Sequence, residues 1–81
     1  MKVRLLYFAV LRDIAGKGEE VVELPEGTRA ADVWNRLRAQ HRALAGYERP
    51  PMTAINESYV PHDQLLRDGD EVAFIPPVAG G

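Results

Sequence analysis

Apolar and polar residues alternate at the start of the chain, over residues 2–8. One side of this segment carries Val3, Leu5 and Tyr7, and the residues between them face the other way. A period of two is typical of a β-strand. A second strand is expected over residues 19–24, which are rich in valine and end at a Pro-Glu-Gly turn. These two strands are expected to pair as a hairpin with a long connection.

Two helical segments are expected, one short and one long. The short one covers residues 9–15 and closes at Gly16. Thr28 is the expected N-cap of the long helix, Asp32 lies in its first turn near the positive end of the helix dipole, and Gly46 is its expected stop. No full capping box is expected, because the third residue after this N-cap is an alanine. Apolar residues recur at helical spacing at Ala30, Val33, Trp34 and Leu37, and Trp34 is expected in the core.

The second half of the chain predicts three more strands. These are residues 52–56, a short return strand at 59–60 after a turn, and residues 71–75; Leu65 and Leu66 are expected to anchor a one-turn segment before the last strand. The first and last strands are the most apolar, so they are expected to be central neighbours. One helix then covers one face of a mixed sheet, which is an α+β fold of the β-grasp kind. The expected division is a domain over residues 1–75 and a tail over residues 76–81.

Composition and charge narrow the range of functions. The chain has 81 residues, which favours one domain, and a net charge of −2, which argues against a nucleic-acid partner because phosphate binding needs a basic face. It contains no cysteine, which excludes disulfides, zinc–thiolate sites and cysteine nucleophiles and favours the cytoplasm. The apolar run over residues 5–11 is too short to span a bilayer, so no membrane partner is expected.

No self-contained active site is visible in the sequence. His41 and His62 are far apart and have no cysteine partners, so no metal site is expected. Asp68 and Asp70 flank a glycine, a spacing typical of a turn. Ser58 is the only serine, and no nucleophile motif surrounds it.

The C-terminal tail is the unusual feature. Pro76 and Pro77 have a fixed φ and no N–H group, so they favour an extended, stiff root. Two small residues, Val78 and Ala79, and then two glycines, Gly80 and Gly81, end the chain. Six extended residues reach roughly 20 Å, at about 3.3 Å each. The pattern suits a tip that enters a narrow channel of another protein, although a frayed terminus is the usual fate of chain ends.

The outer face of the predicted sheet is also unusual. If Val3, Leu5 and Tyr7 face the helix, the residues that face the other way are partly apolar. A sheet face open to water is normally polar, so such a patch indicates a docking surface. The opposite assignment would turn Lys2 and Arg4 toward the core. The predicted partner interface is Leu6, Phe8, Tyr59, Ala73 and Ile75.

Residues 66–81 closely resemble the C-terminus of the MoaD family, the ubiquitin-like sulfur carriers that form the small subunit of molybdopterin synthase. The Asp-Gly-Asp-Glu-Val run at 68–72, the Pro-Pro-Val at 76–78 and the terminal Gly-Gly are in register. Residues 3–12, the Thr28-led helix and residues 54–56 are also similar to that family. There are two departures from its pattern: Ile75 where an aromatic residue is common, and Ala79 where threonine is common.

This resemblance implies a carrier cycle centred on Gly81. An adenylating enzyme related to ubiquitin-activating enzymes would use ATP and magnesium to form an acyl-adenylate there. A sulfur donor, such as a cysteine desulfurase or a rhodanese, would convert this to a thiocarboxylate. The tail would then enter the large subunit and supply dithiolene sulfur to a cyclic pyranopterin precursor. The implied assembly is a heterotetramer of two large and two small subunits. The resemblance also implies that this chain has no catalytic activity by itself and binds no permanent cofactor.

Three other functions remain open from the sequence. The first is sulfur transfer for thiamine or for tRNA thiolation. The second is a protein modifier that forms isopeptide bonds through Gly81. The third is a β-grasp binding module with an inert tail.

Overall fold

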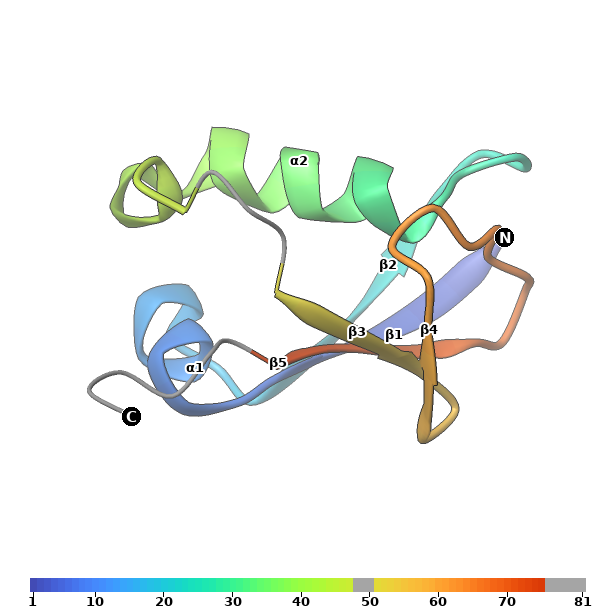
Figure 1. The fold of residues 1–81 in the computed structure, drawn as a ribbon, viewed down its shortest axis with the longest axis horizontal. Coiled ribbons are helices and arrows are strands. Elements are labelled where there is room, and N and C mark those ends of the chain that lie inside the picture. The colour runs from blue at the N-terminus through green and yellow to red at the C-terminus, as the bar shows by residue number, and fades with distance from the viewer. Residues whose placement is uncertain (48–50, 76–81) are drawn as a thin grey trace.

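The structure is a computed structural model that describes residues 1–47 and 51–75. A five-stranded mixed sheet carries the long helix α2 across one face, and the short helix α1 follows the first strand (Figure 1). The elements are β1 (Lys2–Tyr7), α1 (Ala9–Ala15), β2 (Glu19–Glu23), α2 (Ala30–Gln40), the 3-10 turn η1 (Arg42–Leu44), β3 (Met52–Ile55), β4 (Ser58–Val60) and β5 (Glu71–Ile75). The predicted tail, residues 76–81, lies outside the described residues. None of the helices in the described part of the chain is long and apolar enough to cross a membrane.

The sheet has the order β2-β1-β5-β3-β4. β1 pairs with β5 in parallel, and every other neighbouring pair is antiparallel. The prediction that the first and last strands are neighbours within the sheet is therefore confirmed. The arrangement is a β-grasp fold, as expected from the sequence.

The core lies between the sheet and α2. Val3, Leu5 and Tyr7 are buried on the helix side of β1, and Val72 and Phe74 are buried on the same side of β5. Trp34 is confirmed as a core residue, because it is 2 % exposed and its ring centroid lies 5.5 Å from that of Phe74. The pattern of alternation in the sequence therefore assigns the two sheet faces correctly.

The start of α2 differs from the sequence prediction. Thr28 is not the N-cap: its Oγ1 donates to the carbonyl of Pro25 at 2.7 Å, and Arg29 occupies the cap position. The reason is a long-range bridge between Arg29 and Leu65, which holds this stretch extended for one more residue. The shift brings Asp32 to the third helical position, where its Oδ2 accepts from the Arg29 backbone N–H at 2.8 Å, as in one half of a capping box.

Two other local predictions are wrong. α2 ends at Gln40 rather than near Gly46, because His41 is extended and the following 3-10 turn carries Leu44 into the core. Leu65 and Leu66 do not form the predicted one-turn segment. Leu65 pairs with Arg29 in an isolated β-bridge and is 44 % exposed, whereas Leu66 is buried.

Candidate functional site

The face of the sheet opposite α2 is apolar over one half. A single cross-strand row joins four of its residues: Leu6 is opposite Ala73, Ala73 is opposite Ala54, and Ala54 is opposite Tyr59. The two alanines are 7 % and 8 % exposed, whereas Tyr59 is 66 % exposed. Small residues thus form the middle of the row, and a large aromatic side chain stands at its edge.

A second row lies toward the C-terminal end of β5. Ile75 is opposite Met52, which is 57 % exposed. Phe8 follows β1 in an extended conformation, so it continues the alternation away from buried Tyr7, and it is 47 % exposed. We call these two rows together the apolar half of the outer face; its members are Leu6, Phe8, Met52, Ala54, Tyr59, Ala73 and Ile75.

The predicted interface residues therefore share one face of the sheet, while their role in docking stays a prediction. Met52 and Ala54 belong to the same face and were missed from the sequence. The strand at 52–56 was expected, but its faces were not assigned, because they follow only from the antiparallel register with β5. Once that register is known, the 57 % exposure of Met52 identifies it as a surface residue of this face. The sequence alone does not contain this information.

The predicted reacting group, Gly81, lies outside the described residues, as do Pro76, Pro77, Val78, Ala79 and Gly80. Ile75 is the last residue of β5 and belongs to the apolar half. The strand that leads in sequence to the terminal segment therefore ends within the candidate docking face.

The turn before β5 is rigidly anchored. Asp70 is buried and accepts from the Arg67 backbone N–H at 2.8 Å and from Asn56 Nδ2 at 3.0 Å. Asp68 Oδ1 accepts from the Lys2 backbone N–H at 2.7 Å. Both carboxylates hold the backbone, which confirms the turn predicted from the Asp-Gly-Asp spacing. They fix where β5 begins, and thus the register of the outer face.

Two further titratable groups, Tyr7 and His62, have structural partners. Tyr7 donates to Glu20, and burial together with this hydrogen bond raises the pKa of the Tyr7 phenol. His62 Nδ1 lies 3.3 Å from Thr53 Oγ1, and burial lowers the pKa of His62, with a smaller opposing effect from Asp63. Within residues 1–47 and 51–75, no group of three or more His, Cys, Asp or Glu residues is arranged to hold a metal ion.

Comparison with known proteins agrees with this geometry. The model of the ThiS family matches residues 5–81. The chain belongs to the ThiS family. This confirms the resemblance to ubiquitin-like sulfur carriers that the sequence motifs indicated.

Individual relatives match along nearly their whole length. The molybdopterin synthase sulfur carrier subunit of Chlamydomonas reinhardtii is 42% identical, with 100% of both chains covered. The solved structure of a putative molybdopterin converting factor, subunit 1, from Pyrococcus furiosus is 35% identical with a TM-score of 0.81, covering 96% of this chain and 99% of that chain. The small archaeal modifier protein 1 of Methanosarcina acetivorans is 28% identical with a TM-score of 0.77, covering 99% and 96%.

Proposed function

We propose that this protein is the sulfur carrier subunit of a molybdopterin synthase and that Gly81 carries the sulfur as a thiocarboxylate. The observation that carries the proposal is the 42% identity, over the full length of both chains, to a molybdopterin synthase sulfur carrier subunit. The apolar half of the outer face supports it independently, since a carrier needs a surface on which its partner enzymes can dock.

The chemistry belongs to the chain terminus. An ionised C-terminal carboxylate, with a pKa of about 3.5, is a poor electrophile. In the proposed cycle, an adenylating enzyme uses ATP and magnesium to join AMP to the Gly81 carboxylate, and pyrophosphate leaves. The persulfide of a sulfur donor, such as a cysteine desulfurase or a rhodanese, then attacks the acyl carbon, and AMP leaves. A thiol of the partner enzymes reduces the resulting acyl disulfide, which frees the thiocarboxylate and leaves a disulfide on the partner. No side chain of this protein acts as acid or base, so the catalytic groups belong to its partners and no cofactor stays bound.

The large subunit is the proposed partner of the outer face. Docking over the apolar half would bring the end of β5 to the large subunit, and the six residues that follow Ile75 reach roughly 20 Å when extended. The tip could then enter the active site and donate sulfur to the cyclic pyranopterin precursor, one carrier at each end of a large-subunit dimer. The cytoplasm is the proposed site of this cycle.

A second candidate is a protein modifier. The likeness to a small archaeal modifier protein at 28% identity favours it. In that function the activated Gly81 carboxyl would be attacked by a lysine amine, which forms an amide bond and releases AMP. The same activation step serves both candidates, and the nucleophile that follows it distinguishes them.

The intact mass of the protein tests the proposal. The chain is made in cells that contain the adenylating enzyme and the sulfur donor, and its mass is compared with that of protein made in cells without them. We expect one C-terminal oxygen to be replaced by sulfur only in the first sample. An unchanged mass in both samples would contradict sulfur carriage, and lysine-linked adducts of higher mass would favour the modifier.

A further inference from the structure

The outer face changes character toward the N-terminal end of β1. Beyond the row of Leu6 and Ala73, the next row pairs Val21 with Arg4 and Arg4 with Glu71. Two cations and three carboxylates lie at this end of the face and at the neighbouring β3–β4 turn. A fourth carboxylate, Glu19, is opposite Leu6 in the adjoining row and reaches Arg4 from there. We call these residues together the charged half of the outer face; its members are Lys2, Arg4, Glu19, Glu23, Glu57 and Glu71.

The negative charge of this half is only partly compensated. Arg4 Nε lies 3.6 Å from a Glu19 oxygen, and Arg4 Nη1 lies 3.6 Å from a Glu71 oxygen. One guanidinium is thus shared between two carboxylates. Among the residues that the structure describes, Glu23 and Glu57 form no ion pair. The charged half therefore carries a surplus of negative charge at the surface.

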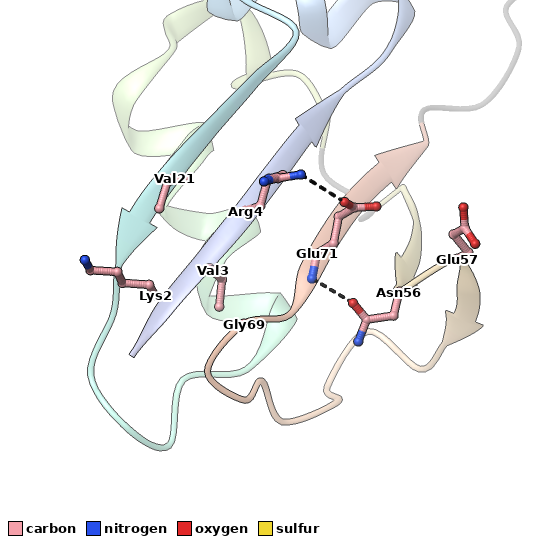
Figure 2. A pocket seen from close by; sticks show the side chains of 8 residues that line it. All are labelled: Lys2, Val3, Arg4, Val21, Asn56, Glu57, Gly69 and Glu71. Carbon is pink, nitrogen blue, oxygen red and sulfur yellow. Dashed lines mark hydrogen bonds and ion pairs between the residues drawn. The ribbon is translucent and has the colours of Figure 1, made fainter.

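The charged half is also hollowed. A depression of about 490 Å³ is lined by Lys2, Arg4, Val21, Asn56, Glu57 and Glu71, together with Val3 and Gly69. Figure 2 shows the Arg4–Glu71 pair in the middle of this depression, with Lys2 on one side and Glu57 on the other. The hollow has room for long side chains that approach from a partner.

The charged half adjoins the apolar half without a gap, because Arg4 and Leu6 are outward neighbours on β1 and Glu71 and Ala73 are outward neighbours on β5. A standard protein interface involves about 20–30 residues a side. The seven residues of the apolar half are too few for this, so a partner seated on them extends over neighbouring surface. The charged half is the part of the same sheet face available for that extension.

We propose that the charged half of the outer face docks lysine and arginine side chains of the protein that covers the apolar half. This inference rests on the proposed function, because the large subunit is the partner that it describes. An apolar patch alone binds a partner without fixing the partner's orientation. Complementary charges at one end of the interface set that orientation and raise the association rate. Orientation matters here, because it decides where the end of β5 and the terminal segment point.

A second copy of this chain is a poor occupant of the same surface. Two copies stacked with their charged halves in contact would bring two negative surfaces together, and like charges oppose that contact. In the reversed orientation each charged half would cover the apolar half of the other copy, which leaves its charges without partners. The surplus of carboxylates therefore favours a basic partner over self-association. It would also keep the exposed apolar half from pairing with itself.

The test compares charge variants in their association with the large subunit. Glu23→Lys combined with Glu57→Lys reverses two exposed charges that have no ion pair among the described residues. Because Glu23 is opposite Lys2 on β1, thermal melting of the double variant checks that the fold remains. The matched control is Glu26→Lys, which changes an exposed carboxylate in the connection between β2 and α2. Figure 1 shows this connection on the α2 side of the sheet. Lys2→Gln acts in the opposite direction, because it removes a cation from the charged half.

Association rates are measured by stopped flow at several salt concentrations. We expect the double reversal to slow association at low salt by about tenfold or more and to remove its salt dependence, since steering by charge is screened by salt. Lys2→Gln is expected to speed association by about twofold, and Glu26→Lys to change it by less than about twofold.

Three outcomes would overturn the inference. If the parent binds the large subunit and the double reversal behaves like Glu26→Lys, the inference is wrong and the proposed function stands. If the parent sediments as a dimer that the double reversal alters, the occupant is a second copy. If the parent does not bind the large subunit at all, the proposed function fails, and the inference fails with it.

Discussion

The two faces of the sheet are made by the same strands, and they differ in what surrounds them. On β5, Val72 and Phe74 are fully buried beneath α2, whereas Ile75 on the opposite face is only half buried and lies beside exposed Met52. Both faces are apolar near the end of β5. Hydrophobicity alone therefore does not identify the core; burial by a second layer does, and the apolar face without that layer is the one available to a partner.

This contrast separates stability from function. A substitution on the helix face removes contacts inside the chain and should lower the free energy of unfolding. A substitution on the outer face removes contacts with a partner and should lower affinity while the fold remains. A change at the chain terminus should affect neither stability nor docking, but only the sulfur-transfer chemistry.

Deletion of Gly81 should have the largest effect. It moves the terminal carboxylate back by about 3.3–3.6 Å, the length of one extended residue. Near-attack geometry tolerates much less than this. We expect no molybdopterin from the truncated protein when the large subunit, the precursor and a sulfur source are supplied.

Binding is the control for that experiment. The truncated protein should keep its melting temperature and still dock through the outer face. Addition of one residue after Gly81 should abolish product formation as well, because the reactive carbonyl then belongs to another residue. Near-normal turnover by the deletion variant would show that Gly81 does not carry the sulfur.

Trp34→Ala tests the helix face. Trp34 packs against Phe74 in the core, so its removal leaves a large cavity and should cost about 3–5 kcal/mol of unfolding free energy. Trp34→Phe is the matched control: it keeps an aromatic ring and removes an indole N–H that has no hydrogen-bond partner among the described residues. Urea denaturation should rank the parent, the Phe variant and the Ala variant in that order, and an Ala variant as stable as the parent would break the contrast between the faces.

Phe8→Asp and Met52→Asp test the outer face. Both side chains are about half exposed, so a charge there should leave the fold nearly intact. Each should weaken binding to the large subunit by more than about 2 kcal/mol, as hot-spot residues do. Calorimetry gives the affinity and thermal melting gives the fold. Normal binding by both variants would remove the apolar half from the interface.

The sequence predicts the elements whose information is local. Alternation over residues 2–8 assigns both faces of β1, and the Asp-Gly-Asp spacing identifies the turn before β5. The errors occur where distant contacts decide. Arg29 replaces Thr28 as the cap of α2 because Leu65, far along the chain, bridges to it. Met52 was missed because its face follows only from pairing with β5.

The same distinction applies to the candidate site. The proposed reacting group, the Gly81 carboxylate, needs no neighbouring side chains, so its motif can be recognised directly in the sequence at the end of the chain. The charged half of the outer face depends on the register of three strands and on the β3–β4 turn. Glu57, for example, reaches this surface from a turn in which both Asn56 and Glu57 have positive φ, a geometry that composition does not reveal.

Pro76→Gly combined with Pro77→Gly should have a smaller effect than the outer-face variants. Glycine has more conformational freedom to lose than proline when the tail is ordered, by about 0.4–1 kcal/mol at each position. We expect binding to weaken by about 1–2 kcal/mol, with no change in thermal stability. Pro25→Gly, in an exposed turn away from the outer face, is the control. Equal affinity of the parent and the double variant would show that the stiffness of the tail does not contribute.

His62→Gln should have the smallest effect, and only in acid. Burial lowers the pKa of His62 from its ordinary value of 6.5, so below that pH the unfolded chain binds more protons at this position than the folded chain does. By linkage, the contribution of His62 to stability is present above pH 6.5 and is lost as the pH falls through its lower folded-state pKa. The parent should therefore lose more melting temperature than the Gln variant on acidification below that pH. Since His62 faces Thr53 on β3 and lies away from the apolar half, its replacement should leave the affinity for the large subunit unchanged. If the melting temperatures of the parent and the Gln variant fall by the same amount as the pH is lowered, His62 has the same pKa in the folded and the unfolded chain.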